Sequence, residues 1–110
     1  IYFLINVYKS MLMRTFSELI NSSKPVLADF WATWCGPCKA MPPVLREVKD
    51  KVGDQATIIK IDVDRNRAVA AAYQVQSIPT LILFKEGKEL WRQAGVVNAA
   101  QLEQVIRRYV

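Results

Sequence analysis

The residues best able to do chemistry are Cys35 and Cys38, in the segment Trp-Cys-Gly-Pro-Cys-Lys. They are the only two cysteines of a 110-residue chain that contains no histidine. A Cys-x-x-Cys step at the start of a helix brings both sulfurs to one face, about one turn apart. This spacing lies within the Cα separation of about 4.4–6.8 Å that a disulfide tolerates. The pair is therefore predicted to form a reversible intramolecular disulfide.

Cys35 is the predicted nucleophile of the pair. It lies where free backbone N–H groups and the positive end of a helix dipole favour an anion, so its thiolate is expected near neutral pH. We expect solvent to reach Cys35, whereas Cys38, one turn further on, is expected to be a buried thiol. The alternatives are half of a zinc site or two inert buried thiols. A tetrahedral zinc site would need ligands from a second chain, so no metal site is expected, and the absence of histidine excludes His-dependent triads.

The elements around the cysteines follow from the hydrophobic pattern. Residues 25–31 and 56–62 are short apolar or β-branched runs, typical of strands covered on both faces. Between them, apolar residues at 41, 44, 45, 48 and 52 mark one face of a helix that begins near Cys35. Pro42-Pro43 should bend this helix early. Strand, helix and strand together predict a parallel pair with a right-handed crossover.

Three further helices are predicted from their starts. Thr15 and Glu18 have the spacing of a capping box, which predicts a first helix over 15–22. Asp64 or Asn66 is expected to open a short helix that reaches about residue 73. Asn98, with Gln three residues later, predicts the cap of a last helix.

The segments 80–84 and 89–94 flank Lys-Glu-Gly-Lys, which predicts a hairpin. The chain is then an α/β protein, with a central mixed β-sheet flanked by helices on both faces. Its length allows one domain, assigned to 15–110. Residues 1–14 are treated as a separate N-terminal segment, either a strand or an upstream extension. No secretory signal and no membrane-spanning helix are expected there.

Charge argues against two classes of partner. Fifteen basic and ten acidic residues give a net charge of +5, and the only adjacent basic pair is Arg107-Arg108. Nucleic-acid and anionic-membrane partners favour clustered basic residues. We therefore expect neither a nucleic-acid nor a membrane partner.

Longer motifs go beyond the Cys-x-x-Cys spacing. They are, in order, Asp29-Phe-Trp-Ala-Thr-Trp-Cys-Gly-Pro-Cys-Lys39, Pro43, Lys60-Ile-Asp62, Ser77-Ile-Pro-Thr80, Phe84-Lys-Glu-Gly87 and Gly95. From about Phe16 to Val110 the chain thereby resembles the thioredoxin family. The resemblance implies the thioredoxin fold and the reduction of protein disulfides through Cys35-Gly-Pro-Cys38. It implies no bound cofactor, protein disulfide substrates, and an external flavoprotein reductase as electron donor.

The resemblance also implies residue roles. Cys35 would attack, Cys38 would resolve the mixed disulfide, and Asp29 would relay a proton with Lys60 as its partner. The bond before Pro79 would be cis. The surface on which target proteins dock would comprise Trp31, Trp34, Gly36, Pro37, Ile78, Pro79 and Gly95.

The residues taken alone also allow other interpretations of these positions. Asp29 could be a purely structural carboxylate, although Lys60 in a second apolar run favours a coupled buried pair. Trp31 could be partly a core residue, whereas Trp34 is expected to be exposed. Val96-Val97 and the basic balance depart from the usual pattern of the family, which leaves partner choice open.

The function expected from the sequence is that of a monomeric, cytoplasmic protein-disulfide reductase. Two alternatives stay open. One is an exported thiol oxidase or isomerase, against which Gly36-Pro37 and the absence of His in the spacer argue. The other is a binding module whose thiols are incidental.

Overall fold

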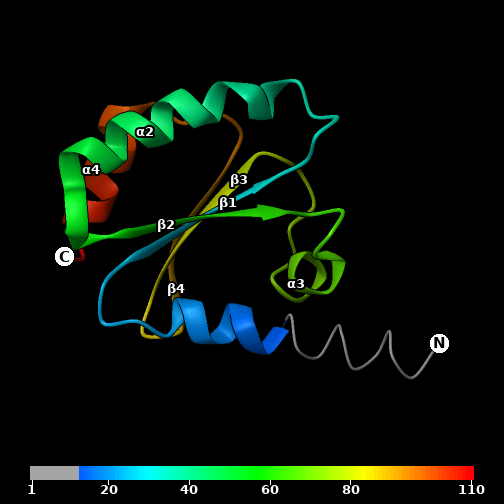
Figure 1. The fold of residues 1–110 in the computed structure, drawn as a ribbon, viewed down its shortest axis with the longest axis horizontal. Coiled ribbons are helices and arrows are strands. Elements are labelled where there is room, and N and C mark those ends of the chain that lie inside the picture. The colour runs from blue at the N-terminus through cyan, green and yellow to red at the C-terminus, as the bar shows by residue number, and fades with distance from the viewer. Residues whose placement is uncertain (1–12) are drawn as a thin grey trace.

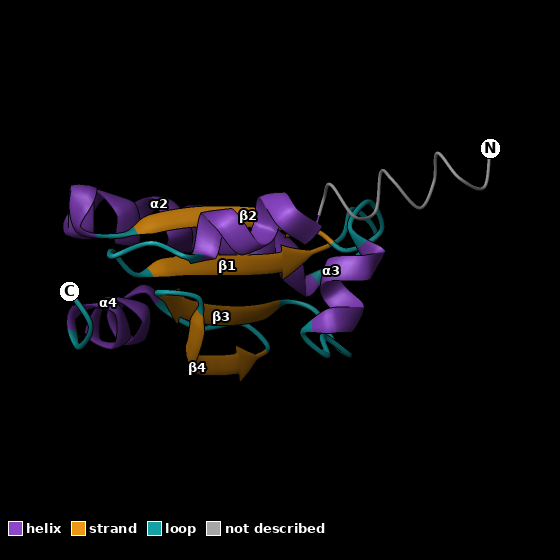
Figure 2. Ribbon diagram, turned by 90° about the horizontal axis from the view of Figure 1, so that it is seen from below, coloured by secondary structure: helices purple, strands orange, loops and turns teal. Residues whose placement is uncertain are grey.

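A four-stranded sheet forms the centre of the molecule in the computed structural model, which describes residues 13–110. The chain is helical over 13–20 and then continues as β1 (Val26–Trp31), η1 (Pro37–Ala40), α2 (Met41–Val52), η2 (Gly53–Gln55), β2 (Thr57–Asp62), α3 (Arg67–Ala72), β3 (Thr80–Lys85), β4 (Lys88–Ala94) and α4 (Ala99–Arg107). The strand order is β2-β1-β3-β4, as Figure 2 shows. Both termini of α2 are joined to parallel strands, as the crossover prediction required.

Strand pairing makes the sheet mixed. β1 runs parallel to β2 and antiparallel to β3, and β3 and β4 form the antiparallel hairpin expected from the sequence. The two turn residues of that hairpin, Glu86 and Gly87, have φ of 54° and 79°. Two residues with positive φ are the requirement of the tight turn that matches strand twist. β1 lies between β2 and β3 and is buried on both faces. This burial agrees with its sequence, in which apolar residues do not alternate with polar ones.

Each face of the sheet carries a separate apolar core. Leu27, Leu81 and Leu83 point to the face covered by α2 and α4. Val26, Phe30 and other residues of the opposite parity pack against helix 13–20 and α3. Figure 1 shows these two pairs of helices on opposite sides of the strands. The expected mixed sheet with helices on both faces is therefore confirmed.

Helix starts were predicted with mixed success. Asn98 caps α4 as expected, because its Oδ1 accepts the N–H of Gln101 at 2.8 Å. The capping box at Thr15 is wrong, since residue 13 is already helical and Thr15 lies within the helix. Asn66 stands at the cap of α3 but makes no capping bond there, and its side-chain N–H donates instead to the carbonyl of Asp62.

Residues 1–12 of the N-terminal segment, for which a strand or an upstream extension was expected, lie outside the described residues. The domain boundary at residue 15 also stays a prediction. From residue 13 onward, no helix is both long and apolar enough to cross a membrane.

Candidate redox site

Cys35 and Cys38 are joined in a disulfide, with their Cα atoms 5.4 Å apart. Cys35 follows the carboxyl end of β1, and Cys38 lies in η1, which leads into α2. This is the strand-to-helix position predicted from the sequence. The predicted intramolecular pair is confirmed.

The backbone beyond the disulfide is helical but changes its hydrogen bonding. Gly36 and Ala40 both have right-handed helical torsions, and the N–H of Met41 donates to the carbonyl of Cys38, three residues back. Pro42 and Pro43 have no N–H with which to make the next bonds to residues four back. The irregularity expected from these prolines thus takes the form of a 3-10 turn, which precedes the regular part of α2.

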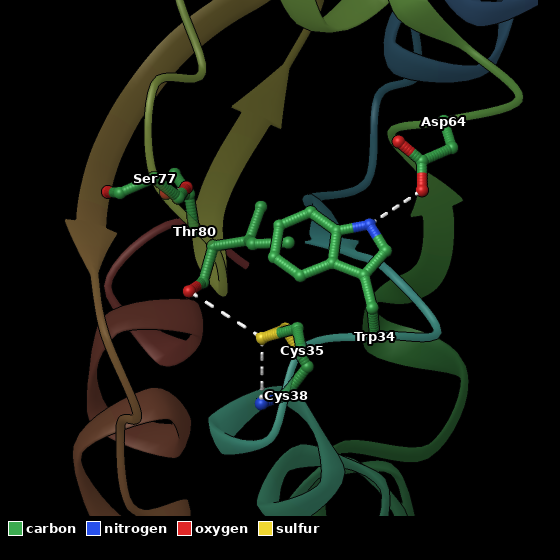
Figure 3. The surroundings of a disulfide bond; sticks show 7 residues. Trp34, Cys35, Cys38, Asp64, Ser77 and Thr80 are labelled. Carbon is green, nitrogen blue, oxygen red and sulfur yellow. Dashed lines mark hydrogen bonds between the residues drawn. A yellow bond between two sulfur atoms is a disulfide. The ribbon is translucent and has the colours of Figure 1, made fainter.

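One backbone donor distinguishes the two sulfurs. The N–H of Cys38 donates to Sγ of Cys35 at 3.2 Å, as Figure 3 shows. Exposure does not distinguish them, because Cys35 is 4% and Cys38 5% exposed. The expectation that solvent reaches only Cys35 is therefore wrong for the disulfide form. Cys35 packs together with Cys38 and Ala32 beside Trp31 and Ile78, and this packing covers both residues.

A second segment faces the disulfide. The bond between Ile78 and Pro79 is cis, and the carbonyl oxygen of Ile78 lies 3.7 Å from Sγ of Cys35. The hydroxyl of Thr80 donates to the carbonyl of Ser77 at 2.5 Å and closes this loop. The backbone N–H of Gly95 donates to the carbonyl of Pro79 at 2.8 Å. Three segments far apart in sequence are thus tied together beside the sulfurs.

Trp34 is the largest exposed apolar side chain next to the disulfide. It is 69% exposed, as expected from the sequence, and its Nε1–H donates to Oδ2 of Asp64 at 2.8 Å. Figure 3 shows the indole held between Asp64 and the loop that carries Ser77 and Thr80. Asp64 therefore orients Trp34, whereas the sequence suggested it as a possible start of α3.

Asp29 is a buried carboxylate in the middle of β1. Its residue is 1% exposed, and neither carboxylate oxygen has a hydrogen-bond partner among the described residues. Burial raises the pKa of Asp29 from its ordinary value of 3.8 to about 6, while the positive charge of Lys60 acts to lower it. The carboxyl can therefore gain and lose a proton close to neutral pH.

Lys60 does not form the buried pair that was expected. It is the register partner of Asp29 on β2, but its side chain is exposed and no ion pair joins it to Asp29 within 4 Å in the described chain. Its Nζ lies 4.8 Å from the ring centroid of Trp31. β2 is outermost among the described strands, so the long side chain can extend to solvent over an aromatic face.

Comparisons with known proteins agree with this geometry. The family model described as thioredoxin matches residues 7–108. A thioredoxin-like protein of Synechocystis sp. is 49% identical over 96 residues, covering 86% of this chain and 91% of that protein. Thioredoxin of Mycolicibacterium smegmatis is 54% identical over 88 residues, covering 78% of this chain and 79% of its own. A mutant thioredoxin from Halobacterium salinarum superimposes with a TM-score of 0.78 at 37% identity, covering 86% of this chain and 81% of that one.

The chain belongs to the thioredoxin family. It has the thioredoxin fold and is a protein thiol-disulfide oxidoreductase whose redox pair is Cys35 and Cys38. Members of the family in general act on protein substrates and work with a thioredoxin reductase. A Mycobacterium leprae protein named bifunctional thioredoxin reductase/thioredoxin is 49% identical over 87 residues, which cover 79% of this chain and 19% of that protein.

The docking residues implied by the thioredoxin resemblance lie in three segments near the disulfide, at 31–37, 78–79 and 95. Gly36 and Pro37 are exposed, Ile78 is partly buried, Pro79 is buried, and Gly95 is exposed at a φ of 90°. Val96 adds an exposed apolar side chain, whereas Val97 is buried in the core. Trp31 is half-buried beside the cysteines, so it contributes to packing as well as to the surface.

Arg92 was not singled out from the sequence. From β4 its guanidinium donates to the carbonyls of Tyr73 at 2.6 Å and Gln74 at 3.3 Å, and it pairs with Glu89 at 2.7 Å. It thereby ties the end of α3, and the start of the loop that leads to Pro79, to the sheet. An isolated arginine on a half-exposed strand gives no sequence signal for such a role.

Proposed function

We propose that this chain reduces disulfides of other proteins, with Cys35 as the attacking thiol and Cys38 as the resolving thiol. The observation that carries the assignment is the N–H of Cys38, which points at Sγ of Cys35. In the reduced protein the same donor would stabilise a thiolate on Cys35, and a thiolate is the nucleophile of disulfide exchange. The backbone supplies Cys38 with no matching donor among the hydrogen bonds of the described site.

The first step breaks the disulfide of the substrate. The Cys35 thiolate attacks one substrate sulfur, a mixed disulfide forms, and the other substrate sulfur leaves as a thiolate that takes a proton. In the second step Cys38 loses its proton and attacks Sγ of Cys35. The Cys35–Cys38 disulfide forms and the second substrate sulfur leaves. Two electrons have then passed from the dithiol to the substrate.

Asp29 is the proposed acceptor of the Cys38 proton. A general base works best when its pKa lies near the working pH, and burial brings the pKa of Asp29 to about 6. Its carboxylate oxygens have no described partner that would compete for the proton. Lys60 acts on this step only through its charge, which opposes the effect of burial.

The docking surface would be formed by Trp31, Trp34, Gly36, Pro37, Ile78, Pro79 and Gly95. An external flavoprotein reductase would return two electrons to the Cys35–Cys38 disulfide. We place the protein in the cytoplasm, because a reductant of disulfides needs a compartment that supplies electrons to it. We propose that it acts there as a monomer.

Reduction of insulin by dithiothreitol, followed as turbidity of the released chains, tests the function. The wild type should accelerate precipitation, and the double variant Cys35→Ser, Cys38→Ser should not. Equilibration in glutathione buffers should give a potential near the value of about −270 mV found for thioredoxin. A potential of about −120 mV would instead identify the protein as a thiol oxidant. Equal precipitation with the double variant would show that the two thiols are not needed for the activity.

A further inference from the structure

Two adjoining hollows run along the side of α2 that faces β2. The outer one, of about 300 Å³, lies over Leu45 and Ile58 and is bordered by Arg46 and Lys49. The inner one, of about 280 Å³, reaches Cys38 and is bordered by Trp31 and Lys39. They share Pro42 and Lys60 as lining residues, so together they form one groove, called here the basic groove.

Four cations border the basic groove, and no carboxylate lines it. They are Lys39, Arg46, Lys49 and Lys60. Within residues 13–110 none of the four forms an ion pair. Lys49 donates to the neutral carbonyls of Gly53 and Ala56, so its charge is held in place but not neutralised. Lys60 lies over the ring of Trp31, and its charge also acts on the buried carboxylate of Asp29, with which it forms no direct ion pair.

The other side of α2 is different. There Lys51 pairs with Glu47 at 3.5 Å and with Glu103 of α4 at 3.7 Å. Of the acidic residues nearest to the groove in sequence, Asp62 already accepts the N–H of Asp64 and pairs with Arg65 at 3.8 Å. Asp50 follows Arg46 by four residues and lines neither hollow. Positive charge on α2 is thus compensated on one side and left open on the side of the groove.

We propose that the basic groove binds an extended acidic segment of the substrate protein, next to the disulfide that the cysteines reduce. This inference rests on the proposed function, because it takes the groove's inner end at Cys38, the disulfide partner of the attacking Cys35, as the end next to the substrate disulfide. From Lys39 to Lys49 the chain rises about 15 Å, at about 1.5 Å per helical residue. An extended peptide advances about 3.3 Å per residue, so four or five residues fill this length. The apolar floor and the four bordering cations, none of which forms a direct ion pair, fit a peptide with acidic side chains.

Binding is tested with the unmutated, oxidised protein and a peptide of four glutamates that contains no cysteine. Backbone amide chemical shifts of residues 39–41, 44–49 and 58–60 should move, and they should move less at high salt. A peptide of four glutamines is the control. Shifts that are absent, equal for both peptides, or larger for a single-stranded oligonucleotide would overturn the proposal. This arm does not depend on whether the protein reduces disulfides.

Turnover is tested with one disulfide peptide that carries either a four-Glu or a four-Gln tail. An exposed ion pair changes an equilibrium by up to about fivefold, and Arg46→Glu exchanges attraction for repulsion. We expect Arg46→Glu to raise KM for the Glu-tailed peptide about three- to tenfold and to leave the Gln-tailed peptide unchanged. Lys88→Glu, at the hairpin turn beyond the far end of β3, makes the same charge change and should leave both values as in wild type.

An equal loss in the two variants would assign the effect to net charge rather than to the groove, and equal KM for the two tails in wild type would contradict the proposal. If neither peptide is reduced at all, the proposed function has failed, while the chemical shifts still decide whether the groove binds acidic peptides.

Discussion

Replacement of Asp29 by Asn should change how stability depends on pH. Burial raises the pKa of Asp29 from 3.8 to about 6 in the folded protein. The folded state therefore holds this proton more tightly than the unfolded state, and stability falls as pH rises between these two values. At about 1.36 kcal/mol per pKa unit, burial of Asp29 lowers stability by about 3 kcal/mol well above pH 6, where the carboxylate is ionised, and this loss vanishes well below pH 3.8, where the carboxyl is protonated in both states.

An asparagine amide does not titrate, so the variant escapes this cost. Urea unfolding of the oxidised wild type and of Asp29→Asn at pH 4 and pH 8 measures the effect. The free energy of unfolding of the variant, relative to wild type, should be higher at pH 8 than at pH 4 by about 2.5 kcal/mol. The hydrogen-bonding cost of burying an amide is the same at both pH values and cancels in this comparison.

The same substitution at exposed Asp50 controls for the loss of one carboxylate and should change stability by less than about 0.5 kcal/mol. A relative stability of Asp29→Asn that is constant between pH 4 and pH 8, or lower at pH 8, would refute the reasoning from burial. Insulin reduction by the same variant separates the two roles. Slower turnover would support the role of Asp29 as proton acceptor. Unchanged turnover with the expected gain in stability would show that Asp29 affects stability but takes no part in proton transfer.

Three further predictions concern contacts that hold the fold and the site. Asn98→Ala should lower the free energy of unfolding by about 1 kcal/mol in urea, and Asn98→Ser should retain most of it because serine also caps helices. Arg92→Ala leaves the carbonyl of Tyr73 without its donor and should cost about 1–3 kcal/mol; recovery of full stability in Arg92→Lys would contradict a role for the forked guanidinium. Asp64→Ala should shift the indole N–H resonance of Trp34 and raise KM for insulin about two- to fivefold, with a stability change below about 1 kcal/mol; an unmoved resonance would show that the bond does not persist in solution.

The strands and helices were predictable because their patterns are local. The β-branched run 56–62 and the helical apolar spacing after Met41 fix their own element types, and the order of elements then limits the sheet to few topologies. Thr15 shows where local rules fail. It has the capping-box spacing, but the helix extends to residue 13, so the preceding residues and the tertiary packing determine the helix start.

The site was predictable in residue type and less so in environment. Asp29 lies in an apolar run, and its burial could be foreseen, whereas the exposure of Lys60 depends on β2 lying outermost among the described strands. The exposure of Cys35 could not be judged, because Ile78, 43 residues later, covers it. The basic groove could not be predicted from the sequence either. Its cations are spread from Lys39 to Lys60 along the chain, and they come together only when α2 packs over β2.

The order of the two cysteines is the central claim, and trapping of the mixed disulfide tests it most directly. In Cys38→Ser, Cys35 can still attack but nothing displaces the product, so disulfide-linked adducts with insulin should accumulate and be released by dithiothreitol. In Cys35→Ser the amide of Cys38 has lost its sulfur acceptor and the attacking thiol is absent, so adducts should not form. Non-reducing gels and mass spectrometry of both variants give the answer. Adducts in Cys38→Ser alone are predicted, and equal trapping by the two variants, or trapping by Cys35→Ser alone, would contradict the account.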